Sequence, residues 1–161
     1  MNEQQPTDFL GEEFRAPEFE YATQGQRFVN YLLDQLFMNY VIGIATEEMI
    51  RQLIVLIDPG YYSGLASSNS MSIAQALLVG FLVSIVNYVL YYTLCEKNFR
   101  GYTLGKLITG TRAIRQNGEE LTFRDALLRS LVRLIPFEPL SGFSTLTWHD
   151  RWTDTMVIKS R

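Results

Sequence analysis

The chain has one cysteine and one histidine among its 161 residues. A single cysteine, Cys95, excludes an intramolecular disulfide and any metal site built from cysteines. The single histidine, His149, has no second histidine to help complete a zinc shell. No basic and apolar leader opens the chain, so we expect internal segments to direct its insertion into a membrane. We therefore predict that the protein holds no metal and no cofactor.

Charge is absent from residues 71–95 and is distributed unevenly elsewhere. Residues 1–26 hold six acids and one base, whereas residues 96–133 hold eight of the fourteen lysines and arginines. A net charge of −3 and the absence of a recognition motif argue against a nucleic-acid partner. Residues 1–22 are predicted to form a flexible acidic tail, because they have little apolar surface to bury. The rest of the chain, 23–161, is expected to form one membrane domain.

The uncharged segment 71–95 predicts a transmembrane helix. As a helix it would be about 37 Å long, enough to cross a hydrocarbon core of about 30 Å with some tilt. Three small residues four positions apart, Ala76, Gly80 and Ser84, form a strip that allows close approach of another helix. We expect the lipid bilayer around this helix and a homo-oligomer or a membrane-protein partner against the strip.

Residues 27–45 predict another span, about 27 Å long, with polar positions on one face. Arg27, Asn30 and Asp34 follow the spacing i, i+3 and i+7 and should face protein or water. The next apolar run, 49–57, is too short to cross alone. It either extends the first helix or lies along the membrane interface, and Asp58-Pro59-Gly60 ends it.

After the second span come a basic loop, 96–122, an amphipathic helix over about 123–135 and a closing segment, 136–161. Residues 106–115 resemble a strand, and Asn117-Gly118 is a strong turn signal. Thr122 with Asp125 three residues later predicts the start of the helix. This helix carries too much charge for a full crossing, so an interfacial, re-entrant or membrane-embedded position is expected. The predicted fold class is an all-α membrane protein with two firm transmembrane helices and this third helix.

The distribution of basic residues predicts the orientation. Segment 46–70 has one base, and segment 96–133 has eight. The positive-inside rule places the basic segment in the cytoplasm and 46–70 outside. The prediction is a multi-pass protein of the plasma (inner) membrane with both termini in the cytoplasm.

Asp34 is the most informative residue, because a carboxylate at a helix centre costs about 2.5–3.5 kcal/mol to insert. Two interpretations stay open. Asp34 forms an ion pair with Arg129 or Arg133, which lie one turn apart on the later helix, and so joins two helices. Alternatively, it is a proton- or cation-binding carboxylate in a transport path.

The remaining polar motifs do not form a complete catalytic site, so no enzymatic activity is predicted. His149 beside Asp150 is compatible with a general base, but a hydrogen-bonded turn at the membrane surface explains the pair as well. The pattern of Gly101, Gly105 and Lys106 resembles a phosphate-binding loop only superficially, because it has three residues between the glycines where that loop has four. Turns that fold the basic loop onto the membrane account for these glycines.

Three stretches together resemble the RDD family of bacterial membrane proteins, named for one arginine and two aspartates. They are RFVNYLLD from Arg27, GYTLGKLITGTRAI from Gly101 and HDRWTDTMVI from His149. The resemblance covers residues 21–158 and implies an inner-membrane protein that transports an unidentified ligand, with cation–proton exchange suggested for some members. It identifies Arg27, Asp34 and Asp150 as signature positions. The supporting candidates are Asn30, Gly101, Gly105, Lys106, Gly110, Arg129, Arg133, His149 and Thr155.

Two functions follow from these observations. The leading one is transport of a small ligand, a cation or protons across the membrane. The alternative is a non-transporting accessory or scaffold protein that binds partners through its cytoplasmic loop and acidic tail.

Overall fold

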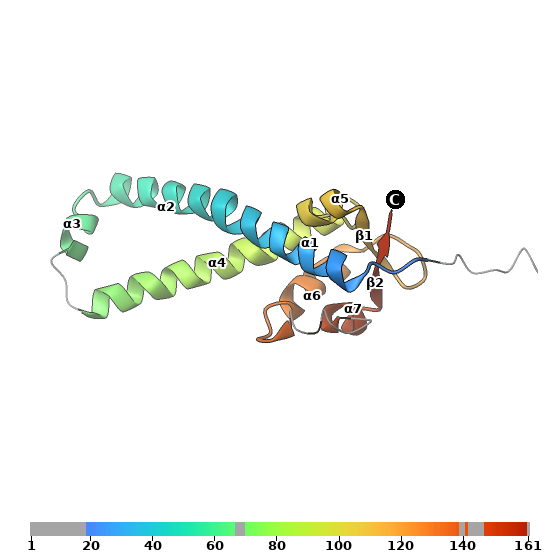
Figure 1. The fold of residues 1–161 in the computed structure, drawn as a ribbon. Helices are drawn as coiled ribbons and strands as arrows, with labels where there is room; N and C mark the ends of the chain where they lie inside the picture. Colours follow the sequence, from blue (N-terminus) through green and yellow to red (C-terminus); the bar gives the residue numbers. More distant parts are fainter. Residues whose placement is uncertain (1–18, 67–69, 139–140, 142–146, 161) are drawn as a thin grey trace, which may run out of the picture.

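The computed structural model of the chain describes residues 19–66, 70–138, 141 and 147–160. Most of the predicted acidic tail therefore lies outside the described residues. Two long helical segments run out from a compact end, and the first and last described residues both belong to that end (Figure 1). The candidate functional residues lie where the long helices enter the compact end.

The first long segment consists of α1 (Gln24–Phe37), a π-helix η1 (Met38–Gly43) and α2 (Ile44–Ile57). Thr23 and Gln26 form a capping box that starts it, and helical backbone angles continue through both junctions. Asp58 adopts an extended conformation before Pro59 and ends it. Of the two possibilities for the apolar run 49–57, the structure therefore shows an extension of the first helix.

The short helix α3 (Tyr61–Ala66) leads to α4 (Ser70–Asn98), which contains the predicted uncharged span. Within the described residues, only Ile73–Asn98 is a single helix both long and apolar enough to cross a membrane. No residue of its most apolar stretch is buried. The second firm span expected over 27–45 is not confirmed, because the π-helix η1 divides this segment and neither α1 nor α2, at 14 residues each, is long enough alone.

The two long segments meet at η1 and then diverge (Figure 1). Met38 packs there against Tyr91 and Tyr92 of α4, and all three side chains are buried. Beyond this crossing α2 buries no residue, and the strip of Ala76, Gly80 and Ser84 on α4 is exposed. Apolar surface on both segments is thus left for lipid or for another protein.

The compact end contains α5 (Leu104–Thr109), β1 (Thr111–Arg115), α6 (Phe123–Val132), α7 (Trp148–Trp152) and β2 (Thr155–Lys159). The two strands pair in antiparallel fashion, from Thr111 opposite Lys159 to Arg115 opposite Thr155. The all-α prediction was wrong in this respect, although the protein is mostly helical. The short β-rich run 155–159 at the end of the chain pairs with β1 and buries apolar side chains on both of its faces.

Two local predictions in this region met different outcomes. The capping box of Thr122 and Asp125 starts α6, as predicted. The strand expected over 106–115 forms only in its second half, because Thr103 caps α5 and Gly110, at φ +67°, ends it. The segment 96–122 is therefore a folded element and not an open loop.

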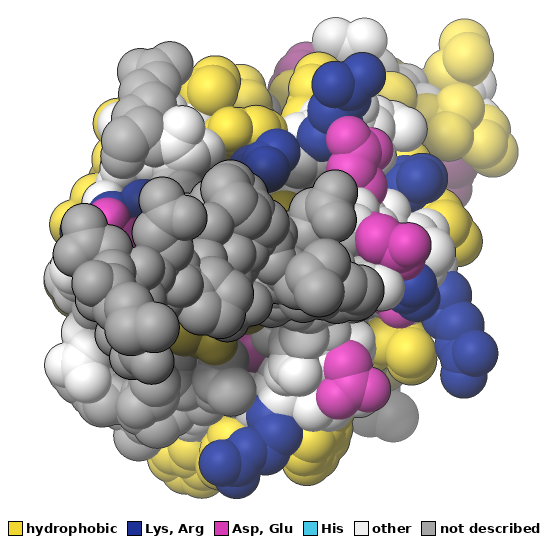
Figure 2. Space-filling model, turned by 90° about the vertical axis from the view of Figure 1, so that its right-hand side faces the viewer, with side chains coloured by type: hydrophobic (Ala, Val, Ile, Leu, Met, Phe, Trp, Pro, Cys, Tyr) yellow, Lys and Arg dark blue, Asp and Glu magenta, His cyan; other side chains and the backbone are white. Residues whose placement is uncertain are grey.

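The outer face of the compact end carries charged side chains of both signs together with apolar ones (Figure 2). Figure 2 looks onto this end and shows acidic and basic side chains next to one another. Arg100 and Glu120 form an exposed ion pair there, with 3.5 Å between Nε and Oε1. Such a surface is suited to water or to lipid headgroups.

Candidate functional site

Asp34 is almost completely buried, at 1% exposure, and is held by hydrogen-bond donors. Its Oδ1 accepts from the Tyr91 hydroxyl and the Gly105 amide, both at 2.8 Å. Its Oδ2 accepts from the Thr103 hydroxyl at 2.7 Å. The ion pair with Arg129 or Arg133, one of the two interpretations left open, does not form among the described residues, because these arginines contact Glu96 and Asp150 instead. Asp34 does join α1 to α4 and α5, but through charge-assisted hydrogen bonds.

The contact between α1 and α5 requires the glycine at position 105. A Cβ atom on Gly105 would lie 2.4 Å from the Asn30 carbonyl oxygen, closer than any real contact. Asn30 also donates from Nδ2 to the Thr111 hydroxyl at 2.9 Å and accepts from the Thr109 hydroxyl. The polar face predicted for the first helix therefore faces protein, where α5 and β1 meet it.

The second predicted glycine position, Gly101, is also sterically required. Its φ is +89°, and an added Cβ would lie 1.9 Å from the Ala113 carbonyl oxygen. The Gly101 amide also donates a hydrogen bond to the Glu96 carbonyl at 2.7 Å, which helps to fix the backbone at this position. The glycines of this stretch thus provide close backbone packing and not a phosphate-binding loop.

Glu96 is the centre of a buried ionic cluster that the sequence analysis did not identify. Its carboxylate contacts Lys106 Nζ at 2.6 Å, Arg129 Nε at 2.8 Å and Arg133 Nη2 at 2.7 Å. Glu96 and Arg129 are both fully buried. One feature of the sequence could have identified this cluster: Glu96 is an acid that directly follows the uncharged span and precedes the basic segment. Burial of this cluster is tolerable because each charge has a partner.

Asp150 connects this cluster to the first helix. Its Oδ1 lies 2.5 Å from Arg129 Nη1, and its Oδ2 lies 3.2 Å from Arg27 Nη1. Arg129 also donates to the Thr155 hydroxyl. Burial by itself would raise the pKa of Asp150, but the neighbouring groups, with Arg129 first among them and Arg27 also contributing, together outweigh burial and hold that pKa well below its ordinary value. Asp150 is therefore a permanent anion that ties α1, α6 and α7 together.

His149 is buried and hydrogen-bonded on both ring nitrogens. Its Nδ1 lies 2.6 Å from Glu138 Oε1, and its Nε2 lies 3.1 Å from the Thr147 hydroxyl and 3.3 Å from Arg133 Nη2. Burial, reinforced by Arg133, lowers the pKa of His149 to about 4. The ring is thus neutral at pH 7, with Nδ1 as donor to Glu138 and Nε2 as acceptor. The described residues include no group of three His, Cys, Asp or Glu side chains that could hold a metal ion.

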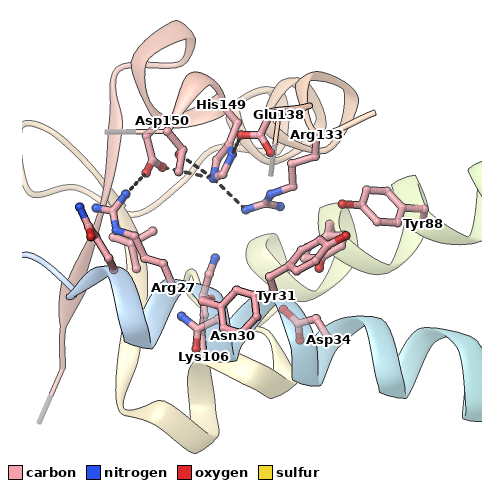
Figure 3. A pocket seen from close by; sticks show the side chains of 15 residues that line it. Arg27, Asn30, Tyr31, Asp34, Tyr88, Lys106, Arg133, Glu138, His149 and Asp150 are labelled. Carbon is pink, nitrogen blue, oxygen red and sulfur yellow. Dashed lines mark hydrogen bonds and ion pairs between the residues drawn. The ribbon is translucent and has the colours of Figure 1, made fainter. Parts of the chain in front are cut away.

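A pocket of about 320 Å³ lies between α1, α4 and the segment around α7 (Figure 3). Tyr88 and Tyr92 of α4 and Phe28 and Tyr31 of α1 provide apolar surface. The candidate residues that line it are Arg27, Asn30, Asp34, Lys106, Arg133, His149 and Asp150. Parts of the chain that are remote in sequence thus contribute to one cavity.

The other candidates stand outside the pocket. Arg129 and Thr155 support Asp150 from behind, and the glycines at 101, 105 and 110 shape the backbone around α5. The strip of Ala76, Gly80 and Ser84 lies on the remote, exposed part of α4.

A sequence model of the RDD family matches residues 21–154. The chain belongs to the RDD family. This is a membrane-associated family, in agreement with the apolar helix α4. No curated protein and no solved structure matches the chain. All three signature residues of this RDD chain, Arg27, Asp34 and Asp150, line the same pocket.

Proposed function

We propose that this RDD chain is an integral membrane protein that binds a small solute in the pocket and takes part in moving it across the membrane. The observation that carries the proposal is the convergence of Arg27, Asp34 and Asp150 on one cavity next to the apolar helix α4. A cavity of this size fits a small organic molecule. Buried charged groups beside a membrane span are costly, and they commonly mark a solute pathway.

The contacts of Asp34 favour a solute over a bare cation. Tyr91, Thr103 and Gly105 already donate to both of its oxygens. A cation would have to displace these donors or compete with them for lone pairs. A solute with its own polar groups can bind without dismantling this arrangement.

The membrane arrangement is part of the proposal. The first long segment and α4 both cross an inner membrane, with α3 outside and both termini in the cytoplasm. The excess of basic residues after α4 supports this orientation. Two crossings cannot enclose a pathway, so a homo-oligomer or a membrane-protein partner completes it. The exposed strip of Ala76, Gly80 and Ser84 offers a surface for that association.

The competing function is an accessory or scaffold protein. The observation in its favour is the exposed, mixed-charge face of the compact end (Figure 2), which is suited to binding a polar protein surface. In that case the buried polar residues only stabilise the fold.

Flux in reconstituted vesicles discriminates between the two functions. Protein in sealed vesicles is given gradients of protons, sodium, inorganic phosphate and small organic anions, and uptake is followed for each. We expect flux of at least one solute, and we expect it to fall in Arg27→Lys, which keeps the charge but loses the guanidinium in the pocket. Arg124→Gln, an exposed change on α6, is the control and should leave flux unchanged. A folded protein that moves none of these solutes would support the scaffold function instead.

A further inference from the structure

The buried polar atoms without partners are all hydrogen-bond donors. Within the described residues, four buried side-chain nitrogens lack a hydrogen-bond partner, and every one belongs to an arginine. They are Arg27 Nη2, Arg112 Nε, Arg129 Nη2 and Arg133 Nη1. A buried donor left unpaired costs about 1–3 kcal/mol, and more when charged, so such a set calls for an acceptor.

Two of these arginines line the pocket. The side chains of Arg27 and Arg133 are 7% and 8% exposed, and both border the cavity. Figure 3 shows them on either side of His149, one from α1 and the other from the end of α6. Two of the four unpaired donors therefore belong to side chains that line the cavity, and these side chains come from two separate elements.

Arg133 is held in place from three directions. Its guanidinium contacts Glu96 at 2.7 Å and His149 at 3.3 Å, and it stacks on the Tyr92 ring, 4.4 Å from the ring centroid. Arg27 is fixed in the same manner, by Asp150 and by the Ala22 carbonyl. Side chains fixed in this way present their remaining N–H groups without further loss of rotamer freedom, which is the condition for strong binding.

Three acids line the pocket beside these arginines, namely Asp34, Glu138 and Asp150. The two oxygens of Asp150 are used by Arg129 and Arg27, and those of Asp34 are used by three donors. Glu138 contacts His149 and Ser141 through Oε1. None of the three acids accepts from Arg27 Nη2 or Arg133 Nη1, and a ligand with negatively charged oxygens would provide the missing acceptors.

We propose that the pocket is a binding site for an organic oxyanion, whose phosphate or carboxylate oxygens accept from Arg27 and Arg133 and whose apolar part lies against the aromatic side chains. Phe28, Tyr31 and Tyr88 line the pocket beside the two arginines. The ligand is therefore amphiphilic, with a charged group at one end and an apolar or aromatic body of limited size. This inference rests on the proposed function and names its class of solute.

Calorimetric titration of the purified full chain in a neutral detergent tests the site without any gradient. Three probes are used. Phenyl phosphate carries both the anionic group and an aromatic body, inorganic phosphate carries the anionic group alone, and phenol carries the aromatic body alone. We expect phenyl phosphate to bind most tightly, inorganic phosphate more weakly and phenol not measurably. Equal binding of phenol and phenyl phosphate would overturn the proposal, because the arginines would then play no part.

Variants connect the binding to the two arginines. Arg133→Lys and Arg27→Lys keep the charge and a contact to the respective acid but remove the unpaired N–H group. Each should weaken phenyl phosphate binding about tenfold to a hundredfold, the range for loss of one hydrogen bond to a charged group. Arg112→Lys is the matched control, since it also has a buried unpaired nitrogen but does not line the pocket. Unchanged binding in both pocket variants, or an equal loss in Arg112→Lys, contradicts the site.

Short-chain phosphatidic acid, added as a competitor, identifies the source of the anion. Displacement of phenyl phosphate assigns the site to a lipid headgroup, and the absence of displacement assigns it to a free solute. Far-UV circular dichroism establishes that each variant is folded. Binding without flux would refute only the transport function, whereas flux of a cation without anion binding would refute only this site.

Discussion

Replacing Gly105 with alanine should separate α5 from α1 and weaken the fold. The added Cβ would lie 2.4 Å from the Asn30 carbonyl oxygen and 2.9 Å from its Cα, and both are backbone atoms that cannot rotate away. The helices must move apart, which costs about 1–3 kcal/mol as overpacking. The shift also stretches the hydrogen bond from the Gly105 amide to Asp34, worth about 1.5–3 kcal/mol because the acceptor is charged. The expected loss is therefore about 2.5–6 kcal/mol.

A urea titration in neutral detergent, followed by fluorescence of Trp148 and Trp152, measures this loss. Gly25→Ala is the matched control on α1 itself, because its Cβ would meet only the Thr23 hydroxyl at 4.0 Å. That variant should be as stable as the original protein, or more stable by up to about 1 kcal/mol through helix propensity. Equal stability of Gly105→Ala and Gly25→Ala would refute the close packing of α5 on α1.

Three further changes test the buried polar groups. Glu96→Gln leaves Lys106, Arg129 and Arg133 without their shared counter-charge, and the free energy of unfolding should drop by about 3–5 kcal/mol in the same titration; a loss below about 1 kcal/mol would contradict the cluster. Tyr91→Phe removes one of three donors to Asp34 and should cost about 1.5–3 kcal/mol, whereas Tyr40→Phe on the exposed face of η1 should cost nothing measurable. The pKa of His149 is lowered to about 4, so between pH 4 and the ordinary value of 6.5 the unfolded chain binds more protons. Stability should therefore fall as the pH drops from about 6.5 toward 4, and His149→Gln should flatten this slope in thermal melts; an unchanged slope would assign it to other groups.

Patterns local in the sequence predicted much of the fold. The uncharged run predicted the apolar part of α4, and Thr122 with Asp125 predicted the start of α6. The spacing of Arg27, Asn30 and Asp34 correctly predicted a face directed toward protein. Each of these inferences depends on periodicity or capping, which act over a few residues.

The partners of the polar residues could not be read from the sequence, because they come from distant segments. Asp34 had two arginines as plausible partners, yet two hydroxyl groups and a backbone amide surround it. Charge complementarity alone favours the arginines, but these are used by Glu96 and Asp150. The strand β2 was missed for the same reason, since its partner β1 lies about forty residues earlier.

The π-helix η1 separates two parts of the first long segment: α1, which buries Asn30 and Asp34, and α2, which buries no residue. Successive residues of an α-helix are about 100° apart, so each residue that a π-turn inserts rotates the following helix by about that angle. The face of α1 that carries Arg27 and Asp34 is therefore not continued by α2, which has no buried residue of its own. Tightening η1 into an α-helix would turn Ile44–Ile57 about its axis while α1 stayed bound to α5 through Asp34. The outer half of this helix thus presents to lipid or to a partner a different side from the one that an unbroken α-helix would present.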